Sequence, residues 1–251
     1  MTEIVAVGGF GSTLKQYESL ADKLHQKFGP DLAISGVNFL SALKHTERLA
    51  DDIDGKYVIT HSAGAYAVAA AVEIGAMPAQ LDMLAPPSYD MTHRLVMNGL
   101  RYELTDRRQR ELDATNRIHE RGEILRHPQA HIGVILALGK FATMPFGAAC
   151  QQGGIMTRIG VMASDGIFEF SQYPVEEIQK ANNAGVKVSM IEGNHTRFTR
   201  DPGAVLDELE TNSVVEIDHR FNNVPVVSLS AMMLGKLAMI SNRAALSRRV
   251  A

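Results

Sequence analysis

Short apolar segments alternate with amphipathic segments through the first third of this sequence, and this alternation constrains the fold more than any other feature. The apolar segments have the length of strands and occupy residues 4–8, 32–39, 57–61 and 81–85. The segment 14–28 between the first two has apolar residues at helical spacing. Strands joined by helices pair in parallel, because the helix returns the chain to the edge where the previous strand began. We therefore expect an α/β fold in which helices cover both faces of a mostly parallel sheet.

The alternation stops at residue 89 and resumes after residue 156. Two further strands are predicted at 158–164 and 186–192, and each is followed by a helical segment. The intervening segment 89–156 has helical patterns throughout, first with arginines mixed with acidic residues and then with an apolar part. We interpret 89–156 as a helical cap inserted over the sheet. Residues 1–88 and 157–251 would then form a core with about six strands.

The first strand leads directly into glycines, in the stretch "IVAVGGFGST" at residues 4–13. Such a loop can hold a phosphate or a dinucleotide, or it can present backbone N–H groups to an oxyanion. The dinucleotide fingerprint G-x-G-x-x-G needs a third glycine where this sequence has Leu14, and an acidic residue after the next strand, where it reads "VNFLS". A phosphate-binding loop needs Gly-Lys-Ser or Gly-Lys-Thr, which the stretch also lacks. The residues therefore argue against a nucleotide and leave the oxyanion role open.

A serine stands where the third predicted strand meets the next helix, in the stretch "VITHSAGAY". Ala63 and Gly64 follow Ser62, and such small residues are needed where a strand and a helix crowd together at a sharp turn. The stretch resembles the G-x-S-x-G nucleophile elbow of the alpha/beta-hydrolase superfamily, with Thr60 in place of the first glycine. A serine that opens a helix can also be only an N-cap, so the stretch alone leaves a structural role open.

The order of residues along the chain extends this resemblance. In the alpha/beta-hydrolase superfamily the catalytic residues follow one another as serine, acid and histidine. Asp165 and His195 each come directly after one of the last two predicted strands. The resemblance therefore implies a catalytic triad of Ser62, Asp165 and His195 at the carboxyl edge of the sheet.

Two other residues compete for these roles. Asp90 follows the fourth predicted strand, where some members of the superfamily have their acid, and it can instead cap the insertion. His219 is an alternative base in a segment that the pattern does not place. His61 precedes Ser62 and is expected to point away from it, so we interpret His61 as a packing residue.

The resemblance also implies an oxyanion hole and a substrate pocket. The glycine loop occupies the place of the superfamily's oxyanion loop, with Gly8 where a histidine is usual, so the N–H groups of Phe10 and Ala63 are the expected donors. The apolar part of the insertion, 131–149, would face an apolar acyl group, although its residues can equally well bury one another. The expected substrate-binding residues are Gly9, Phe10, Leu136 and Phe141.

From the resemblance we expect a serine hydrolase that cleaves a carboxylester, lactone or thioester of an apolar small molecule through an acyl-enzyme, with no cofactor and no metal. Esterases, lipases, lactonases, thioesterases, carbon–carbon bond hydrolases and cofactor-free haloperoxidases share this fold, so the fold does not choose among them. The alternative is a protein of the same fold that binds a ligand or a partner without catalysis. Thr60 and Gly8, which depart from the superfamily's pattern, keep this alternative open.

Composition argues against several other classes of protein. A net charge of −3 gives no sign of a basic surface for nucleic acid. The single cysteine, Cys150, excludes a disulfide framework and argues against a cysteine zinc site. The longest apolar run is too short to span a bilayer, and the residues before the first strand lack the basic segment of a signal peptide. We therefore expect a cytoplasmic protein that acts on a small-molecule acyl substrate, and a homodimer remains open.

Overall fold

The computed structural model describes residues 3–9, 12, 14–87, 141–168 and 173–212, and the statements below concern these residues. By its contacts the chain divides into a unit 1–216 and a unit 217–251, and all the described residues belong to the first unit. The predicted core ran to residue 251, and its residues 213–251 lie outside the described ranges.

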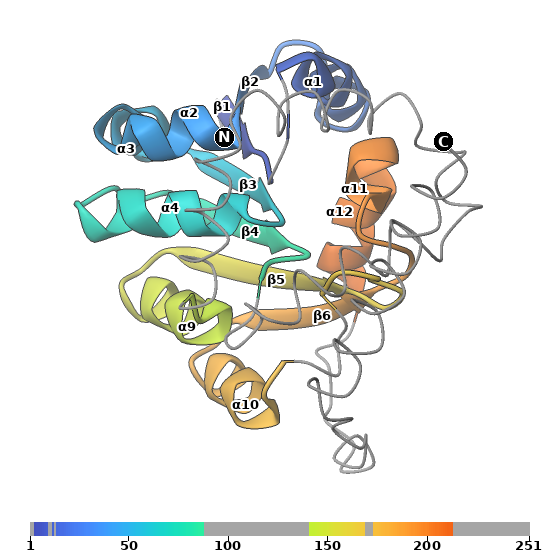
Figure 1. Ribbon diagram of the computed structural model, residues 1–251. Helices are drawn as coiled ribbons and strands as arrows, with labels where there is room; N and C mark the ends of the chain where they lie inside the picture. Colours follow the sequence, from blue (N-terminus) through green and yellow to red (C-terminus); the bar gives the residue numbers. More distant parts are fainter. Residues whose placement is uncertain (1–2, 10–11, 13, 88–140, 169–172, 213–251) are drawn as a thin grey trace, which may run out of the picture. The chain divides into compact units, whose positions relative to one another are not determined.

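Six parallel strands form one sheet, which confirms the fold class predicted from the alternating pattern (Figure 1). The strands are β1 Glu3–Val7, β2 Ala33–Val37, β3 Tyr57–His61, β4 Gln80–Leu84, β5 Met156–Met162 and β6 Lys187–Ile191. Their order across the sheet is β2-β1-β3-β4-β5-β6, and each neighbouring pair is parallel. The chain thus moves from β1 to β2 in one direction and returns to the other side of β1 as β3. At such a reversal the chain leaves β1 and β3 toward opposite faces of the sheet, and a crevice opens between the two connections.

Helices cover both faces of the sheet (Figure 1). On one face, three helices pack together: α1 Leu14–Phe28, α11 Arg197–Arg200 and α12 Pro202–Thr211. On the opposite face are α2 Phe39–Lys44, α3 Thr46–Ile53, α4 Gly64–Glu73, α9 Thr143–Gln152 and α10 Val175–Asn183.

Local chemistry sets where some of these helices begin. Asn38 caps α2 by accepting a hydrogen bond from the N–H of Ser41 at 3.1 Å. The next helix, α3, is separate because His45 leaves the helical region at φ −127° and ψ 56°. The pattern of residues 41–53 predicts one helix, and the structure has two at this place. Pro202 is the first residue of α12, a position where a missing N–H costs no hydrogen bond.

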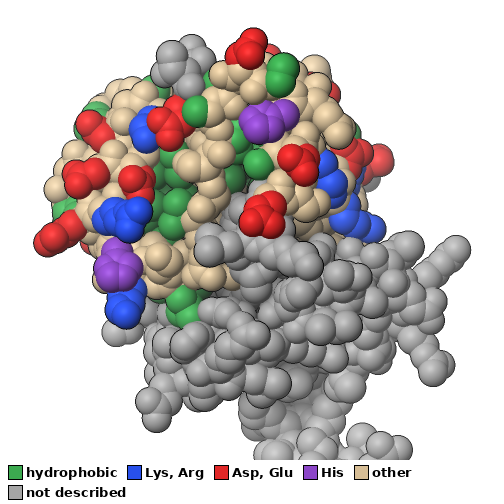
Figure 2. All heavy atoms as spheres, turned by 90° about the horizontal axis from the view of Figure 1, so that it is seen from above, with side chains coloured by type: hydrophobic (Ala, Val, Ile, Leu, Met, Phe, Trp, Pro, Cys, Tyr) green, Lys and Arg blue, Asp and Glu red, His purple; other side chains and the backbone are tan. Residues whose placement is uncertain are grey.

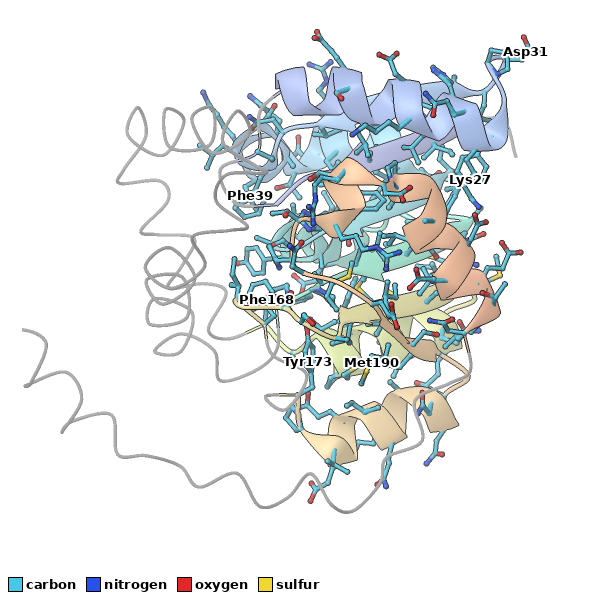
Figure 3. The ribbon with its side chains drawn as sticks, turned by 90° about the vertical axis from the view of Figure 1, so that its right-hand side faces the viewer. Lys27, Asp31, Phe39, Phe168, Tyr173 and Met190 are labelled. Atoms are coloured by element: carbon cyan, nitrogen blue, oxygen red, sulfur yellow. The ribbon has the colours of Figure 1, made fainter. Side chains whose placement is uncertain are left out.

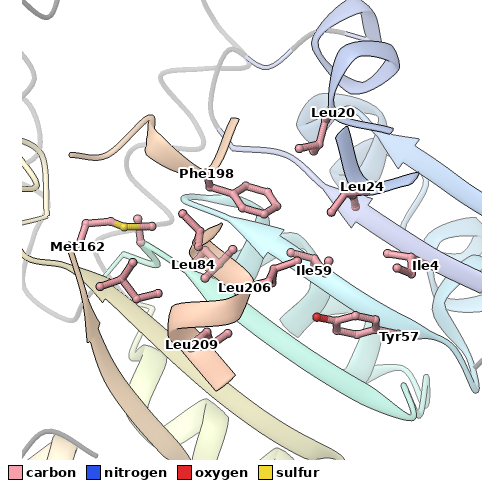
Figure 4. Close-up of a cluster of buried hydrophobic side chains, with 14 residues drawn as sticks. Ile4, Leu20, Leu24, Tyr57, Ile59, Leu84, Met162, Phe198, Leu206 and Leu209 are labelled. Atoms are coloured by element: carbon pink, nitrogen blue, oxygen red, sulfur yellow. The ribbon is translucent and has the colours of Figure 1, made fainter. Parts of the chain in front are cut away.

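The face covered by α1, α11 and α12 contains a core of buried apolar side chains (Figure 4). Ile4 and Ile59 contribute from the strands, Leu24 from α1, and Phe198 and Leu206 from the helices after β6, all at most 1% exposed. Burying a side chain of this size stabilises the fold by roughly 1.5–3 kcal/mol. The segment that follows β6 is therefore held firmly against the first strands of the chain.

At the end of the predicted cap, the structure differs from the expectation. Most of the predicted cap, 89–156, lies outside the described residues. Its last helix, α9, packs against β5 and α10, in the layer of helices that covers the sheet. Gly147 permits this approach, because a Cβ atom there would lie only 3.0 Å from Ile159 Cδ1. Residues 143–156 therefore belong to the core, and the predicted boundary at residue 156 is corrected to a point before α9.

Acidic and basic side chains are interspersed on the face that Figure 2 shows, in keeping with a net charge of −3. Neither sign of charge forms a continuous patch among the described residues that this view shows. None of the helices within the described ranges is long and apolar enough to cross a membrane.

A buried ion pair joins β4 to β5. The carboxylate of Asp82 is fully buried and accepts hydrogen bonds from Arg158, at 2.8 Å from Nε and at 2.6 Å from Nη2. Tyr57 of β3 donates its hydroxyl to the same carboxylate. Burial, followed by the charge of Asp82, raises the pKa of Tyr57 well above its usual value, so the hydroxyl stays a donor. One carboxylate thus links three neighbouring strands.

Replacing Asp82 with asparagine should strongly destabilise the protein. The change leaves the guanidinium of Arg158 without its counter-charge, and losing one partner of a buried pair costs about 3–5 kcal/mol. Asp52→Asn is the control, because Asp52 is only half-buried and its Oδ2 lies 3.8 Å from Nε of the exposed Arg48. Urea denaturation followed by circular dichroism measures both variants. Equal free energies of unfolding for the two variants would contradict the role of the buried pair.

Candidate active site

Two loops start side by side at the carboxyl edge of the sheet, because β1 and β3 are neighbouring parallel strands. In Figure 3, Phe39 and Phe168, which follow β2 and β5, lie at this edge, and Asp31, which precedes β2, lies at the opposite one. Gly9 follows β1 and Ser62 follows β3. A Cβ atom on Gly9 would lie 2.6 Å from Ser62 Cβ and 3.1 Å from Ser62 Oγ. Only a glycine leaves room for the serine, and the backbone of the glycine loop therefore reaches its hydroxyl.

Ser62 has an unusual backbone conformation. Its φ angle is 55°, in the left-handed region that residues other than glycine rarely adopt. Its N–H donates a 2.8 Å hydrogen bond to the carbonyl of Leu84, which ties the turn to the end of β4. Strain of this kind persists only where the surrounding structure imposes it, and it is concentrated at functional sites. The backbone at Ser62 thus forms a sharp turn from strand to helix.

Small residues make this turn possible. Ala63, the N-cap of α4, is buried, and a Cβ atom on Gly64 would collide with the carbonyl oxygen of Val7. The first N–H groups of a helix have no partner within the helix, so this end of α4 can donate to an anion. Thr60, in place of the superfamily's first glycine, is fully buried within the sheet, with Oγ1 3.5 Å from the carbonyl oxygen of Asp82.

Asp165 and His195 meet at the same edge. His195 Nδ1 donates a 2.8 Å hydrogen bond to Asp165 Oδ2, and the two residues are 6% and 3% exposed. Because an ionised carboxylate only accepts hydrogen bonds, Nδ1 carries the hydrogen and Nε2 is left as the acceptor. The pair can therefore take a proton at Nε2, and the buried carboxylate can stabilise the imidazolium that results.

The carboxylate of Asp165 is oriented by its own loop. Its second oxygen, Oδ1, accepts hydrogen bonds from the N–H groups of Ile167 at 2.7 Å and Phe168 at 2.8 Å. The ring of Phe168 packs edge-on against His195, with centroids 5.2 Å apart. Burial, followed by the charge of Asp165, raises the pKa of Tyr173 well above its usual value, so a neutral phenol lies near the carboxylate.

The loop that carries His195 is held by polar side chains. Asn194 Oδ1 accepts hydrogen bonds from Arg200 Nη2 at 2.9 Å and from the N–H of Thr196 at 3.2 Å. Arg197 forms an ion pair with Glu208 of α12. These bonds connect the loop to the helices that are packed on the first strands.

His61 lies differently from the interpretation based on sequence, which treated it as a packing residue that points away from the site. Its Nε2 atom is 2.7 Å from the backbone oxygen of His195, and the two imidazole rings are 4.9 Å apart. Sequence reasoning also missed Phe168 and Asn194. Both lie in loops, where no periodic pattern marks a functional position. For His61, the only signal in the sequence is its place directly before Ser62.

Several predicted site residues lie outside the described residues. They are Phe10, Leu136, the alternative acid Asp90 and the alternative base His219. Phe141 is described and is buried, with its ring edge-on to Tyr66 at 5.7 Å and 5.6 Å from the ring of Phe146. Tyr66 belongs to α4, one turn after the strained serine. Phe141 is therefore connected by packing to the helix that begins at the turn.

Cys150 is buried in α9, and burial raises the pKa of its thiol to about 12, as is typical of an inert cysteine. Within the part of the chain that the structure describes, no three side chains of His, Cys, Asp or Glu gather in the way that would hold a metal ion.

Comparison with solved structures confirms the fold. A bromoperoxidase from Bacillus anthracis is similar over 84% of this chain and 92% of its own, with a TM-score of 0.58 and 14% identity. An enol-lactonase from Burkholderia xenovorans LB400 is similar over 83% of this chain and 90% of its own, with a TM-score of 0.55 and 8% identity. Both are alpha/beta hydrolases, and this chain has the alpha/beta-hydrolase fold. No family model and no curated protein matches the sequence.

Replacing Ser62 with glycine should give a more stable protein than replacing it with alanine. Glycine adopts a φ of 55° without strain and alanine does not, which favours the glycine variant by about 1 kcal/mol. At Ser19, an exposed position inside α1, the order should be reversed, because glycine weakens a helix relative to alanine. Thermal unfolding of the four variants tests both orders. If alanine is the better replacement at Ser62 as well, the turn is not strained in solution.

Proposed function

We propose that this protein is a serine hydrolase that cleaves a carboxylester, lactone or thioester bond through a triad of Ser62, Asp165 and His195. The observation that carries the proposal is the buried 2.8 Å hydrogen bond from His195 Nδ1 to Asp165 Oδ2. This bond lies at the sheet edge where Ser62 has its left-handed turn. A histidine oriented by a carboxylate, together with a serine at a sharp turn between strand and helix, is the arrangement by which a weak hydroxyl nucleophile is activated.

In the proposed mechanism, Ser62 Oγ attacks the carbonyl carbon of the substrate while His195 Nε2 takes its proton. The carbonyl oxygen becomes an oxyanion, which the N–H of Ala63 and an N–H of the glycine loop at Phe10 would bind. His195 then gives the proton to the leaving group, and an acyl-enzyme remains on Ser62. A water molecule, deprotonated by His195 in turn, hydrolyses the acyl-enzyme and restores the serine. Asp165 stays ionised throughout and stabilises the imidazolium.

The substrate that we propose is an apolar small molecule. Phe141 and Tyr66 pack together beside the start of α4, so an apolar acyl group could extend from Ser62 along these aromatic rings. We propose Gly9, Phe10, Leu136 and Phe141 as the substrate-binding residues. The structural neighbours named above act on different substrates, and their shared fold does not choose among ester-type bonds.

A fluorophosphonate probe should label Ser62 and no other serine. Mass spectrometry of the labelled protein identifies the site, and Ser62→Ala should abolish both labelling and the hydrolysis of p-nitrophenyl esters. Ser164→Ala, which changes an exposed serine next to Asp165, is the control and should leave labelling at the wild-type level. Labelling at Ser12 or Ser164, or none in the wild-type protein, would overturn the proposal and leave a binding protein of the same fold.

Asp165→Asn should lower kcat by about 10³–10⁴-fold, because an amide no longer holds His195 in the correct tautomer or stabilises its cation. Asp90→Asn is the matched comparison, since Asp90 is the alternative acid. Steady-state hydrolysis of a p-nitrophenyl ester measures both variants. A large loss in Asp90→Asn with little loss in Asp165→Asn would transfer the acid role to Asp90.

Gly9→Ala should slow labelling of Ser62 strongly, because the new Cβ atom would lie 2.6 Å from Ser62 Cβ and force the serine or the loop to move. Gly203→Ala is the control for a glycine-to-alanine change. The Cβ atom there would meet only Lys27 Cβ, at an ordinary 3.9 Å. The rate of fluorophosphonate labelling compares the two variants. A wild-type rate in Gly9→Ala would mean that the two loops are not in close contact in solution.

A further inference from the structure

The imidazole of His61 spans from one catalytic loop to the other. His61 is the last residue of β3, and β4 and β5 lie between β3 and β6 in the sheet. Its side chain nevertheless reaches the loop after β6, where Nε2 lies 2.7 Å from the backbone oxygen of His195. A carbonyl oxygen only accepts, so Nε2 of His61 carries the hydrogen and donates. This single bond joins the neighbour of the nucleophile to the backbone of the base.

Packing adds to this hydrogen bond. The ring of His61 lies 4.9 Å from the ring of His195 and 5.9 Å from the ring of Phe198, centroid to centroid. On another side, Phe168 contacts His195 edge-on. The imidazole of His195 is thus held by rings from two other elements, and its Nδ1 atom is held by Asp165.

His61 is also chemically suited to stay neutral beside a base that becomes charged. Burial, followed by the proximity of His195, lowers the pKa of His61 to about 3. A neutral imidazole has one N–H, and here that N–H is used on the His195 carbonyl. His61 therefore adds no positive charge next to the imidazolium that forms on His195 during the reaction.

We propose that His61 is a positioning residue that fixes the position and orientation of the His195 imidazole relative to the hydroxyl of Ser62. The proposal rests on the function proposed above, in which His195 must take a proton from Ser62. His61 does not touch the reacting atoms in this scheme. It acts through the backbone of His195. Because His61 is also the neighbour of Ser62 in the chain, it links the position of one catalytic loop to that of the other.

The test compares two replacements of His61. His61→Phe keeps a ring for packing and removes the N–H donor, whereas His61→Gln keeps an N–H donor at nearly the same reach. His61→Phe should lower kcat, and the rate of fluorophosphonate labelling, by between about tenfold and hundredfold with KM little changed, because a small misplacement of a catalytic group has a cost of this size. His61→Gln should retain most of the wild-type rate.

His25 supplies a matched control. It is also a partly buried histidine, with Nε2 3.0 Å from the backbone oxygen of Leu32, and it belongs to α1 rather than to the catalytic loops. His25→Phe should lower the melting temperature about as much as His61→Phe does while leaving kcat unchanged. If His61→Phe does not fold, His61→Met takes its place, because methionine also lacks the donor and fills irregular space.

A second readout separates this proposal from the proposed function. The Nδ1 proton that His195 shares with Asp165 can be followed by proton NMR in the wild-type protein and its variants. Its signal should shift or exchange faster in His61→Phe and stay in place in His61→Gln, whether or not the protein hydrolyses esters. A wild-type protein that is not labelled refutes the hydrolase function alone. The role of His61 is overturned if His61→Phe changes neither the signal nor the labelling rate. It is also overturned if His61→Phe and His61→Gln lower kcat and the labelling rate equally.

Discussion

Parallel strands end at the same edge of a sheet, and the arrangement of the candidate site follows from this constraint. Ser62, Asp165 and His195 come after β3, β5 and β6, so all three are delivered to one edge. The pairing of β1 with β3 likewise places Gly9 next to Ser62. These four residues each lie within four positions of the end of a strand, so the hydrogen-bonded sheet sets the spacing between them.

The layout of this edge could be predicted from the sequence because it depends on local signals. Short apolar runs predict strands, and the residues directly after these strands must lie at the carboxyl edge of a parallel sheet. The small residues Ala63 and Gly64 after Ser62 predict a sharp turn for the same kind of reason, since nothing larger fits where strand and helix cross. The fold class and the placement of Asp165 and His195 after their strands could therefore be derived without a structure.

Contacts between distant parts of the chain could not be predicted in this way. The bond from His61 to the His195 carbonyl depends on the strand order and on the path of a loop, neither of which leaves a periodic pattern. The pair of Asp82 and Arg158 likewise depends on the register of β4 against β5. The role of α9 was misjudged because an apolar helix reads the same whether it covers a sheet or an active site. Gly147, which lets α9 approach β5, is informative only once the partner is known.

The pairing of β4 with β5 has a consequence for how the chain folds. The strands β1 to β4 are joined by short connections, but the chain between β4 and β5 runs through residues 85–155. The entropy lost in closing a loop grows only with the logarithm of its length, so this long connection slows the search for β5 more than it weakens the final sheet. Arg158 can reach the buried carboxylate of Asp82 only when β5 is in its native register, since a shift by one residue would turn its side chain to the other face. The ion pair thus favours the native register of β4 and β5, the two neighbouring strands whose long connection constrains their register least.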